Sequence, residues 1–325
     1  MGPLHGVTLS ELLVGIIGTG AIAPTHARVI AKTPGARLAY VNSRTRSRAE
    51  AFAAEHGAEL AEDVDQLIER SDAVVICCPG HAHAGYALDA LRAGKAVLCE
   101  KPGATSVPQA EQIVEAVERG GIYQLGLNRR HAPVYRRLAE LLENGFGPTS
   151  YAARINRGEL QSPSWVGDRS ISGGYGFETV VHLVDLLRHL FGEVGDLTAR
   201  VSRNVYSEPD DLTLLFEHEG GVHGALTSCA HATWMPPFER VEVFGREATL
   251  RTDELDRLSY RLGLGSETRH DDFSALPEHV RWGFEEQMRI FVSRARGETK
   301  PNGEAGARDL LAATNVLAKV YEAES

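Results

Sequence analysis

The chain has 325 residues, of which 43% are hydrophobic and 24% are charged, and its formal net charge is -10 at pH 7. At about 100 to 200 residues per domain, this length predicts two domains. Because no basic stripe offsets the negative charge, the composition argues against nucleic acid or a membrane surface as the main partner and favours a small-molecule ligand.

The opening segment Met1–Glu11 lacks the basic, apolar and cleavage regions of a secretory signal, and no apolar run approaches the ~18 residues of a membrane span. The cysteines show no spacing typical of a disulfide framework or a zinc site. We therefore expect a cytoplasmic protein whose cysteines are small core residues. These are Cys77, Cys78, Cys99 and Cys229.

The first part of the chain alternates short apolar strands with helical patterns, which predicts an α/β fold with a doubly wound parallel sheet. The strands are expected at Leu13–Ile17, Arg37–Val41, Ala73–Cys77, Ala96–Cys99 and Ile122–Leu127. The helices are expected near Ala21–Lys32, Arg46–His56, Val64–Arg70, Ala82–Ala93, Val107–Arg119 and Ala132–Glu143.

After Asn144–Pro148 strand-like runs dominate, separated by glycine turns, as in an antiparallel sheet. They lie at Ser150–Asn156, Leu197–Tyr206, Leu212–His218, Val222–Ala230, Glu239–Phe244 and Ala248–Arg251. Helical patterns occur at Phe177–Phe191, His279–Ala295 and Ala307–Glu322. We expect one domain over residues 1–127 and a second over 128–325, with the last helix packing back on the first domain.

The segment Gly18-Thr19-Gly20-Ala21-Ile22-Ala23 follows a strand, opens a helix and matches the dinucleotide fingerprint G-x-G-x-x-G/A. Gly18 permits the tight turn, Gly20 lets the backbone approach a pyrophosphate, and the helix N-terminus supplies amide donors to the phosphates. A plain glycine turn is the alternative. The βαβ units that follow favour a Rossmann nucleotide-binding domain.

About twenty residues further on, an NAD site usually offers an acidic side chain to the ribose. This chain has Asn42, Ser43, Arg44, Arg46 and Arg48 there instead. Arginines at a helix start oppose the helix dipole unless an anion neutralises them, and a ribose 2′-phosphate is such an anion. NADP is therefore preferred over NAD. In the alternative, the arginines form a solvated face and Asn42 holds an unphosphorylated ribose.

Two short segments follow buried strands, at the sheet edge where ligands bind. Lys101, in the run Leu98–Pro102, lies at the end of the strand expected over Ala96–Cys99, although a solvated turn with a surface ion pair is the alternative. In Pro79–His83 the two histidines lack a matching cluster of metal ligands, so we expect no metal. Pro79 and His83 are expected to line the cofactor site, His83 in a structural or cofactor-contacting role.

On the helix expected at 177–191, Glu178, His182, Asp185 and His189 share one stripe, while apolar residues cover the rest. An ionisable stripe on a buried helix must face partners or a cavity, which we take to be the active site. A satisfied core network around His182 is the alternative. A metal site here has no further ligand cluster to support it.

The G-T-G-A-I-A turn, the E-K-P run and the E-x-x-x-H-x-x-D helix together resemble the glucose-fructose oxidoreductase and inositol dehydrogenase family. The resemblance extends to Gly126–Pro133 and to Pro301–Gly303. It implies a Rossmann domain followed by an α/β domain whose open, mostly antiparallel sheet often forms oligomer contacts. We therefore expect a homo-oligomer, dimer or tetramer, formed through that sheet.

The resemblance also implies hydride transfer between nicotinamide and a carbinol or ketone of a sugar, cyclitol or related polyol. Lys101 matches the lysine that contacts substrate and cofactor, and His182 matches the histidine acid/base. Glu178 stands where many members carry aspartate, and Asn42 departs from the acidic residue of NAD-preferring members. Glu178 or Asp185 would orient the imidazole or bind a substrate hydroxyl.

Further residues complete the predicted site. Glu100 and Asn128 are expected at the cofactor. The substrate pocket is expected to be lined by Arg130, Arg157, Trp165 and Tyr175, although ordinary packing is an equal alternative for each. A reductase or dehydrogenase acting on a non-sugar carbonyl or diol remains open, as does a non-catalytic NAD(P)-binding regulator, which the presence of both Lys101 and His182 disfavours.

Overall fold

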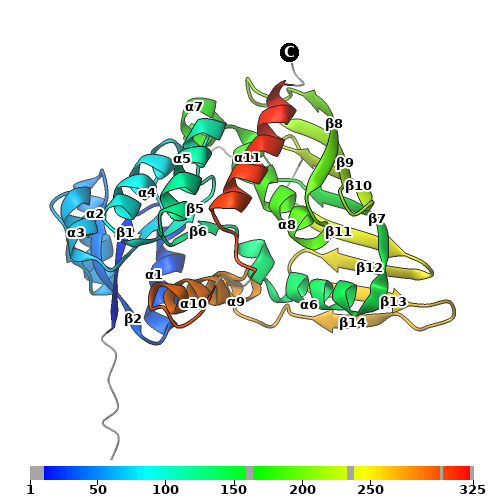
Figure 1. Cartoon of the computed structure of the whole chain (residues 1–325), viewed down its shortest axis with the longest axis horizontal. Helices are drawn as coiled ribbons and strands as arrows, with labels where there is room; N and C mark the ends of the chain where they lie inside the picture. Colours follow the sequence, from blue (N-terminus) through cyan, green and yellow to red (C-terminus); the bar gives the residue numbers. More distant parts are fainter. Residues whose placement is uncertain (1–10, 159–163, 233–237, 301–302, 323–325) are drawn as a thin grey trace, which may run out of the picture.

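The computed structural model describes residues 11–158, 164–232, 238–300 and 303–322. Within these ranges, no helix has the length and apolar character needed to cross a bilayer. Two sheets organise the fold, and helices lie between them (Figure 1).

The first sheet is parallel and has six strands in the order β3-β2-β1-β4-β5-β6. Its strands are β1 (Leu12–Ile17), β2 (Ala36–Asn42), β3 (Glu59–Leu60), β4 (Ala73–Ile76), β5 (Ala96–Glu100) and β6 (Tyr123–Gly126). The helices that connect them are α1 (Ala23–Lys32), α2 (Arg46–His56), α3 (Val64–Arg70), α4 (His83–Arg92) and α5 (Val107–Glu118). The strand order reverses between β1 and β4, which is where an open α/β sheet forms its ligand crevice.

The second sheet has eight strands in the order β14-β13-β12-β11-β7-β10-β9-β8, and only the β7–β10 pair is parallel. Its strands are β7 (Pro148–Ile155), β8 (Val194–Ser202), β9 (Asp211–His218), β10 (His223–Cys229), β11 (Glu239–Gly245), β12 (Ala248–Asp253), β13 (Arg257–Leu262) and β14 (Arg269–Asp272). The predicted α/β class, with one parallel and one mostly antiparallel sheet, is confirmed.

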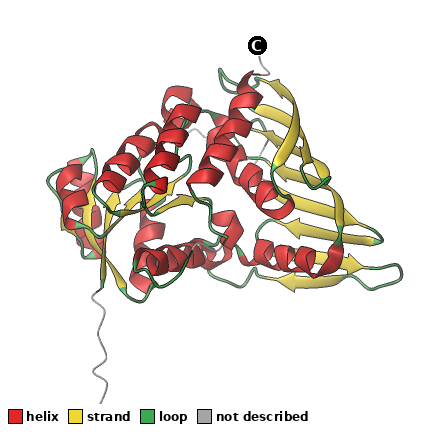
Figure 2. Cartoon of the chain, viewed as in Figure 1, coloured by secondary structure: helices red, strands yellow, loops and turns green. Residues whose placement is uncertain are grey.

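Three helices pack on one face of this second sheet, as Figure 2 shows. They are α6 (Pro133–Leu141), α8 (Val181–Phe191) and α11 (Ala307–Glu322). The short helices α7 (Arg169–Ser172) and α9 (Glu278–Arg281) and the longer α10 (Phe284–Ala295) complete the fold. α10 packs against α1, where Met288 and Phe291 join the core of the parallel sheet, while α11 packs against α5. A domain division after residue 127 stays a prediction.

The structure differs from the predicted elements most clearly in three places, besides the unexpected short elements β3 and α7. The single helix expected over 279–295 is two helices, because Gly283 between them has φ +85°, and a Cβ there would lie 2.4 Å from the carbonyl oxygen of Asn128. The helix expected from Phe177 begins instead with a π-helical turn, Gly176–Val180. The sheet also continues past Arg251 into two strands that were not expected. β13 alternates polar and apolar residues and could have been predicted, whereas β14 is entirely polar and lacks the alternation that identifies a strand.

Candidate active site

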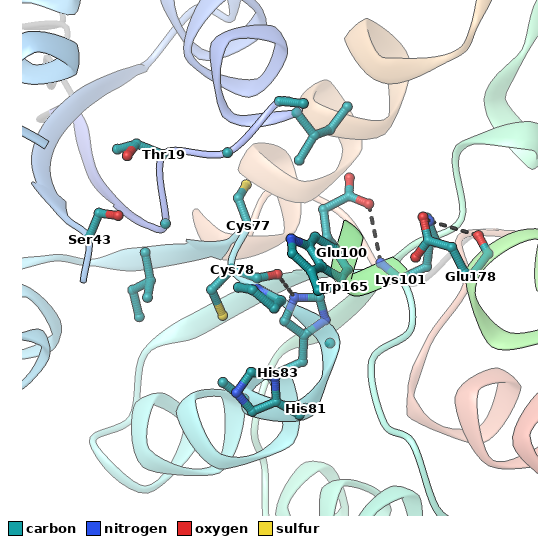
Figure 3. A pocket seen from close by; sticks show the side chains of 18 of the residues that line it. Thr19, Ser43, Cys77, Cys78, His81, His83, Glu100, Lys101, Trp165 and Glu178 are labelled. Atoms are coloured by element: carbon teal, nitrogen blue, oxygen red, sulfur yellow. Dashed lines mark hydrogen bonds and ion pairs between the residues drawn. The ribbon is translucent and has the colours of Figure 1, made fainter. Parts of the chain in front are cut away.

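A cavity of about 710 Å³ lies at the carboxyl ends of β1, β4 and β5. The glycine turn and the loops after β2 and β4 supply one end of its lining. Lys101 after β5, together with β7, α8 and the segments around Phe238 and Trp282, supplies the other. Figure 3 shows residues from both ends around the same space, from Thr19 and Ser43 to Lys101 and Glu178. We call the first the coenzyme end and the second the substrate end.

The glycine turn lines the coenzyme end. Gly18 has φ +94°, and a Cβ on it would lie 2.7 Å from the amide nitrogen of Cys78, so only glycine fits there. A Cβ on Gly20 would meet nothing closer than 3.7 Å, which leaves this backbone open to the cavity. Thr19, Ala21 and Ile22 line the same wall ahead of α1.

Polar and basic side chains line the cavity beyond β2. Asn42 Nδ2 donates a hydrogen bond to the carbonyl oxygen of Ala61 at 3.1 Å. Ser43, Arg44 and Arg48 line the cavity beside it. An open glycine backbone, a helix N-terminus and two guanidinium groups are donors suited to the phosphates of a dinucleotide, so this end fits an NAD(P) cofactor.

Lys101 and Glu178 meet at the substrate end (Figure 3). The Lys101 Nζ lies 2.7 Å from Glu178 Oε1 and donates to the Glu178 carbonyl oxygen at 2.8 Å. Arg157 Nη1 donates to the same Oε1 at 3.1 Å. One carboxylate therefore holds two cations. Burial lowers the pKa of Lys101, and Arg157 lowers it further, while Glu178 opposes both effects.

His182 also lines the cavity. Its Nδ1 is buried and has no hydrogen-bond partner within the described residues. Burial lowers the pKa of His182 well below its ordinary value, and the positive charges of Arg129, Lys101 and Arg157 lower it further. The imidazole is therefore neutral near pH 7 and can accept a proton.

Asp185 and Arg130 are not part of the cavity lining, so placing them at the substrate was wrong. Asp185 is fully buried, and Arg130 Nε donates to its Oδ2 at 2.8 Å. Arg130 Nη2 also donates to Asp309 Oδ1 at 2.7 Å. Asp185 follows His182 by three residues, which is less than the 3.6 residues of a full helical turn. Its side chain on α8 is therefore rotated away from His182 toward this ion pair. His189, the last residue of the expected stripe, is exposed.

Neither of the two carboxylates expected to orient the imidazole bonds it in the described part of the chain, because Glu178 is engaged by Lys101 and Arg157 and Asp185 by Arg130. Tyr175 was also misplaced in the substrate pocket. It is buried away from the cavity, where its hydroxyl lies 2.9 Å from Ser228 Oγ.

Arg157 and Trp165 both line the cavity. The loop expected before Trp165 includes Ser162 and Pro163, which lie outside the described residues, as do Pro301 and Asn302 of the last resemblance segment.

The other expected cofactor residues line the cavity but are bonded to the protein itself. Glu100 Oε1 lies 2.7 Å from His26 Nε2. The His83 ring nitrogens lie 2.7 Å from the Pro102 oxygen and 2.5 Å from the Cys78 oxygen, and Pro79 lies nearby in the lining. Asn128 Nδ2 donates to the Trp282 oxygen at 2.8 Å. These side chains brace the walls of the site.

Sequence reasoning missed Arg129, Thr179, Phe238, Trp282 and Phe284 in the lining. Arg129 stacks over the Trp282 ring at 4.8 Å, and its Nη2 donates to the buried Glu239 at 2.8 Å. It adjoins Arg130 in the sequence, and no local pattern distinguishes the arginine that faces the cavity from the one that faces the core. Within the described ranges, no group of three or more His, Cys, Asp or Glu residues could hold a metal.

Two family models match the chain. The model of the oxidoreductase family with an NAD-binding Rossmann fold matches residues 12–127. The model of the GFO/IDH/MocA C-terminal domain matches residues 135–251. An inositol 2-dehydrogenase from Cereibacter sphaeroides is 33% identical over 267 residues, which cover 78% of this chain and 77% of that protein.

Two solved structures share the fold. Levoglucosan dehydrogenase in complex with NADH and levoglucosan has a TM-score of 0.87 at 20% identity, covering 97% of this chain and 98% of the other. A 3-ketoreductase from Actinomadura kijaniata in complex with TDP-benzene and NADP has a TM-score of 0.82 at 23% identity, with 97% and 98% covered. The family models and the inositol 2-dehydrogenase relative agree with the motifs, and the chain belongs to the GFO/IDH/MocA family of NAD(P)-dependent oxidoreductases.

Proposed function

We propose that the chain is a dehydrogenase or reductase that uses NADP in preference to NAD and acts on a secondary alcohol or ketone of a sugar or cyclitol. One observation carries the proposal. Lys101, Glu178 and His182 line the same cavity as the open glycine turn and the guanidinium groups of Arg44 and Arg48. The inositol 2-dehydrogenase relative and the levoglucosan dehydrogenase neighbour support the substrate class.

Each reacting side chain has a distinct role. A nicotinamide cofactor held by the glycine turn, Arg44 and Arg48 would supply the hydride acceptor for oxidation and the hydride donor for reduction. Neutral His182 takes the hydroxyl proton in oxidation and returns it in reduction. The Lys101 ammonium stabilises alkoxide character on the reacting oxygen. Glu178 holds that ammonium in place through its carboxylate and its backbone carbonyl.

The preference for NADP rests on Arg44 and Arg48. Both line the coenzyme end beside Asn42, where an NAD site commonly presents a carboxylate. Two guanidinium groups can bind a 2′-phosphate through several charge-assisted hydrogen bonds. Both nicotinamide cofactors occur among the structural neighbours, so the choice must be measured on this chain.

A coupled assay tests the function. The protein is mixed with NADP⁺ or NAD⁺ and a panel of sugars and cyclitols, and reduction of the nicotinamide is followed by absorbance. We expect turnover of at least one polyol, and loss of that turnover by about 10²- to 10⁴-fold in His182→Asn. Cofactor binding without turnover of any polyol would instead support a non-catalytic NAD(P)-binding protein.

The proposal also includes a cytoplasmic homo-oligomer joined through the second sheet. Leu215 on β9 and Phe244 on β11 are 53% and 38% exposed. Strand pairing from Leu215 through Ala225 and Ala152 to Glu242 places both on one face. All four cysteines are free thiols, which suits a reducing compartment. Light scattering on the eluting protein measures the subunit number.

A further inference from the structure

Glu100 is a buried carboxylate at the cavity that the proposed mechanism does not use. It is the last residue of β5, directly before Lys101, and its side chain lines the cavity. Figure 3 shows it beside Lys101. Only 6% of Glu100 is exposed. Because a charged group is rarely buried to this extent without a partner or a function, this carboxylate is a candidate for a further role in the reaction.

Two hydrogen bonds hold the carboxylate in place. Its Oε1 lies 2.7 Å from Nε2 of His26 on α1, and its Oε2 accepts from the backbone amide of Lys101 at 3.2 Å. α1 is the helix that the glycine turn opens. The carboxylate therefore links the helix of the coenzyme end to the backbone of the reacting lysine.

The pair formed by Glu100 and His26 carries a net negative charge. Burial raises the pKa of Glu100, but His26 and Lys101 lower it by more, so this pKa stays below its ordinary value. His26 is also buried, and its Nδ1 has no hydrogen-bond partner among the described residues. A second proton on the imidazole would occupy that nitrogen and bury an unpaired N–H. The neutral imidazole therefore donates from Nε2 to an ionised carboxylate.

The proposed function places the nicotinamide ring beside this carboxylate. Hydride transfer requires contact between the ring and the carbinol carbon, whose oxygen meets Lys101 and His182 in the proposed mechanism. The Glu100 carboxylate bonds the Lys101 amide from the side of α1. The oxidised ring carries a positive charge, whereas the reduced ring is neutral. A fixed negative charge at this place therefore distinguishes the two forms of the cofactor.

Glu178, the other carboxylate in the described part of the lining, is less suited to this role. Its Oε1 is bonded by two cations, Lys101 at 2.7 Å and Arg157 at 3.1 Å. The bonds of Glu100 come instead from the imidazole of His26 and from a backbone amide, and neither of these neutral donors cancels its charge.

We propose that Glu100 is the counter-ion of the oxidised nicotinamide, held by His26 so that the protein binds the oxidised cofactor more tightly, relative to the reduced one, than it would without this carboxylate. The inference rests on the proposed dehydrogenase function and adds a residue that selects the redox state of the bound cofactor. The oxidised form is the one that accepts hydride, so Glu100 favours the cofactor state that alcohol oxidation needs.

Calorimetric titration with NADP⁺ and with NADPH, in the absence of substrate, measures this effect without turnover. The measured quantity is the affinity ratio, defined as the Kd of NADP⁺ divided by the Kd of NADPH. Both forms share their phosphates and riboses, so the contacts of Arg44 and Arg48 cancel in this ratio. If the wild-type protein binds NAD⁺ and NADH more tightly, the same ratio is measured with that pair.

Glu100→Gln should raise the affinity ratio about tenfold. Two unit charges about 7 Å apart at an effective dielectric constant of about 20 change a binding constant by about 50-fold, and water in the cavity screens part of this effect. Glutamine can keep both hydrogen bonds, because its amide nitrogen can donate to His26 and its oxygen can accept from Lys101.

Glu69→Gln is the matched control and should leave the affinity ratio unchanged. Glu69 is exposed and lies outside the cavity lining, and its carbonyl oxygen accepts from Lys95 at the opposite end of β5. Glu100→Asp and Glu100→Asn repeat the comparison with a side chain one methylene shorter, in case glutamine is not tolerated. Aspartate should keep the ratio within about threefold of wild type, and asparagine should raise it about tenfold.

The inference is wrong if Glu100→Gln weakens both forms of the cofactor equally, if the affinity ratio falls or stays within about twofold of wild type, or if Glu69→Gln raises it as much. It is also wrong if the aspartate and asparagine variants have the same ratio. In each of these cases the wild-type protein still binds its cofactor, and the dehydrogenase function stands. A wild-type protein that binds neither NADP(H) nor NAD(H) would refute the proposed function, and the inference with it.

Discussion

Replacing Lys101 with methionine removes the ammonium group and keeps a side chain of similar length. The structure gives Nζ two contacts, with Glu178 Oε1 at 2.7 Å and with the Glu178 carbonyl oxygen at 2.8 Å. A unit charge pair at that distance is worth about 6 kcal/mol at an effective dielectric constant of about 20, before desolvation is subtracted. The net loss of alkoxide stabilisation is smaller, about 3 to 4 kcal/mol, which corresponds to about 10²- to 10³-fold in kcat.

The variant should keep its cofactor affinity within about threefold, because the contacts of Nζ are with Glu178 and not with the glycine turn or the arginines of the coenzyme end. Its pH profile should also move. Lys101 lowers the pKa of His182, so its loss lets that pKa rise. Oxidation needs the neutral imidazole, and the pH below which the rate falls should therefore be higher in Lys101→Met.

Steady-state kinetics over a range of pH, together with NADPH fluorescence titration, measure these effects. Lys95→Met is the matched control, because Lys95 immediately precedes β5 and its ammonium donates to the exposed Glu69 carbonyl oxygen at 3.0 Å, outside the cavity lining. A rate for Lys101→Met within a few-fold of wild type, or a loss of NADPH affinity as large as the loss of rate, would refute the assigned role.

Three further predictions concern other parts of the molecule. Arg44→Ala should weaken NADPH binding about tenfold or more and NADH binding little. Arg46→Ala is the control, because Arg46 is not part of the cavity lining. Equal weakening of both cofactors would contradict the assignment of Arg44 to the 2′-phosphate. Asp185→Asn breaks the buried pair with Arg130 and should lower the free energy of unfolding, measured by urea denaturation, by about 3 kcal/mol. The pH profile of kcat should not move; a moved profile would mean that Asp185 acts on His182. Burial raises the pKa of Glu208 to about 7, so the folded state holds a proton that the unfolded chain has lost, and stability falls as pH rises from about 5 to 7. Glu208→Gln should remove this loss and gain up to about 3 kcal/mol over wild type above pH 7; a stability difference that does not change with pH would show that Glu208 does not titrate in this range.

The sequence was sufficient for the parallel sheet apart from its short edge strand β3, and for the residues that follow the strands β1, β4 and β5. Lys101 could be placed because the end of a buried strand has one location in a doubly wound sheet. Glu178 and His182 could be placed on the same side of their helix because four residues span about one helical turn. The structure brings all three side chains to one cavity.

Other side chains depended on partners that are distant in the sequence. Arg130 and Asp185 form a buried ion pair that includes Asp309, and no local pattern announces such a contact. Arg129 lines the cavity, and its guanidinium is held there by Glu239, the first residue of β11.

Tyr175 was expected to line the substrate pocket, but its hydroxyl lies 2.9 Å from Ser228 Oγ on β10, in the core. β14 extends the second sheet although its residues are all polar, because pairing with β13 supplies the order that its own sequence does not; β13 in turn pairs with β12.

A crystal structure of the protein with NADPH tests the central claim most directly. The account predicts that nicotinamide C4 faces the space between Lys101 Nζ and His182. Both side chains should lie within about 7 Å of C4, since one contact of about 3.5 Å joins C4 to the substrate and a second joins the substrate to each side chain. It also predicts the 2′-phosphate against Arg44 and Arg48. A nicotinamide ring turned away from that space, or lying well beyond that distance from either side chain, would contradict the account.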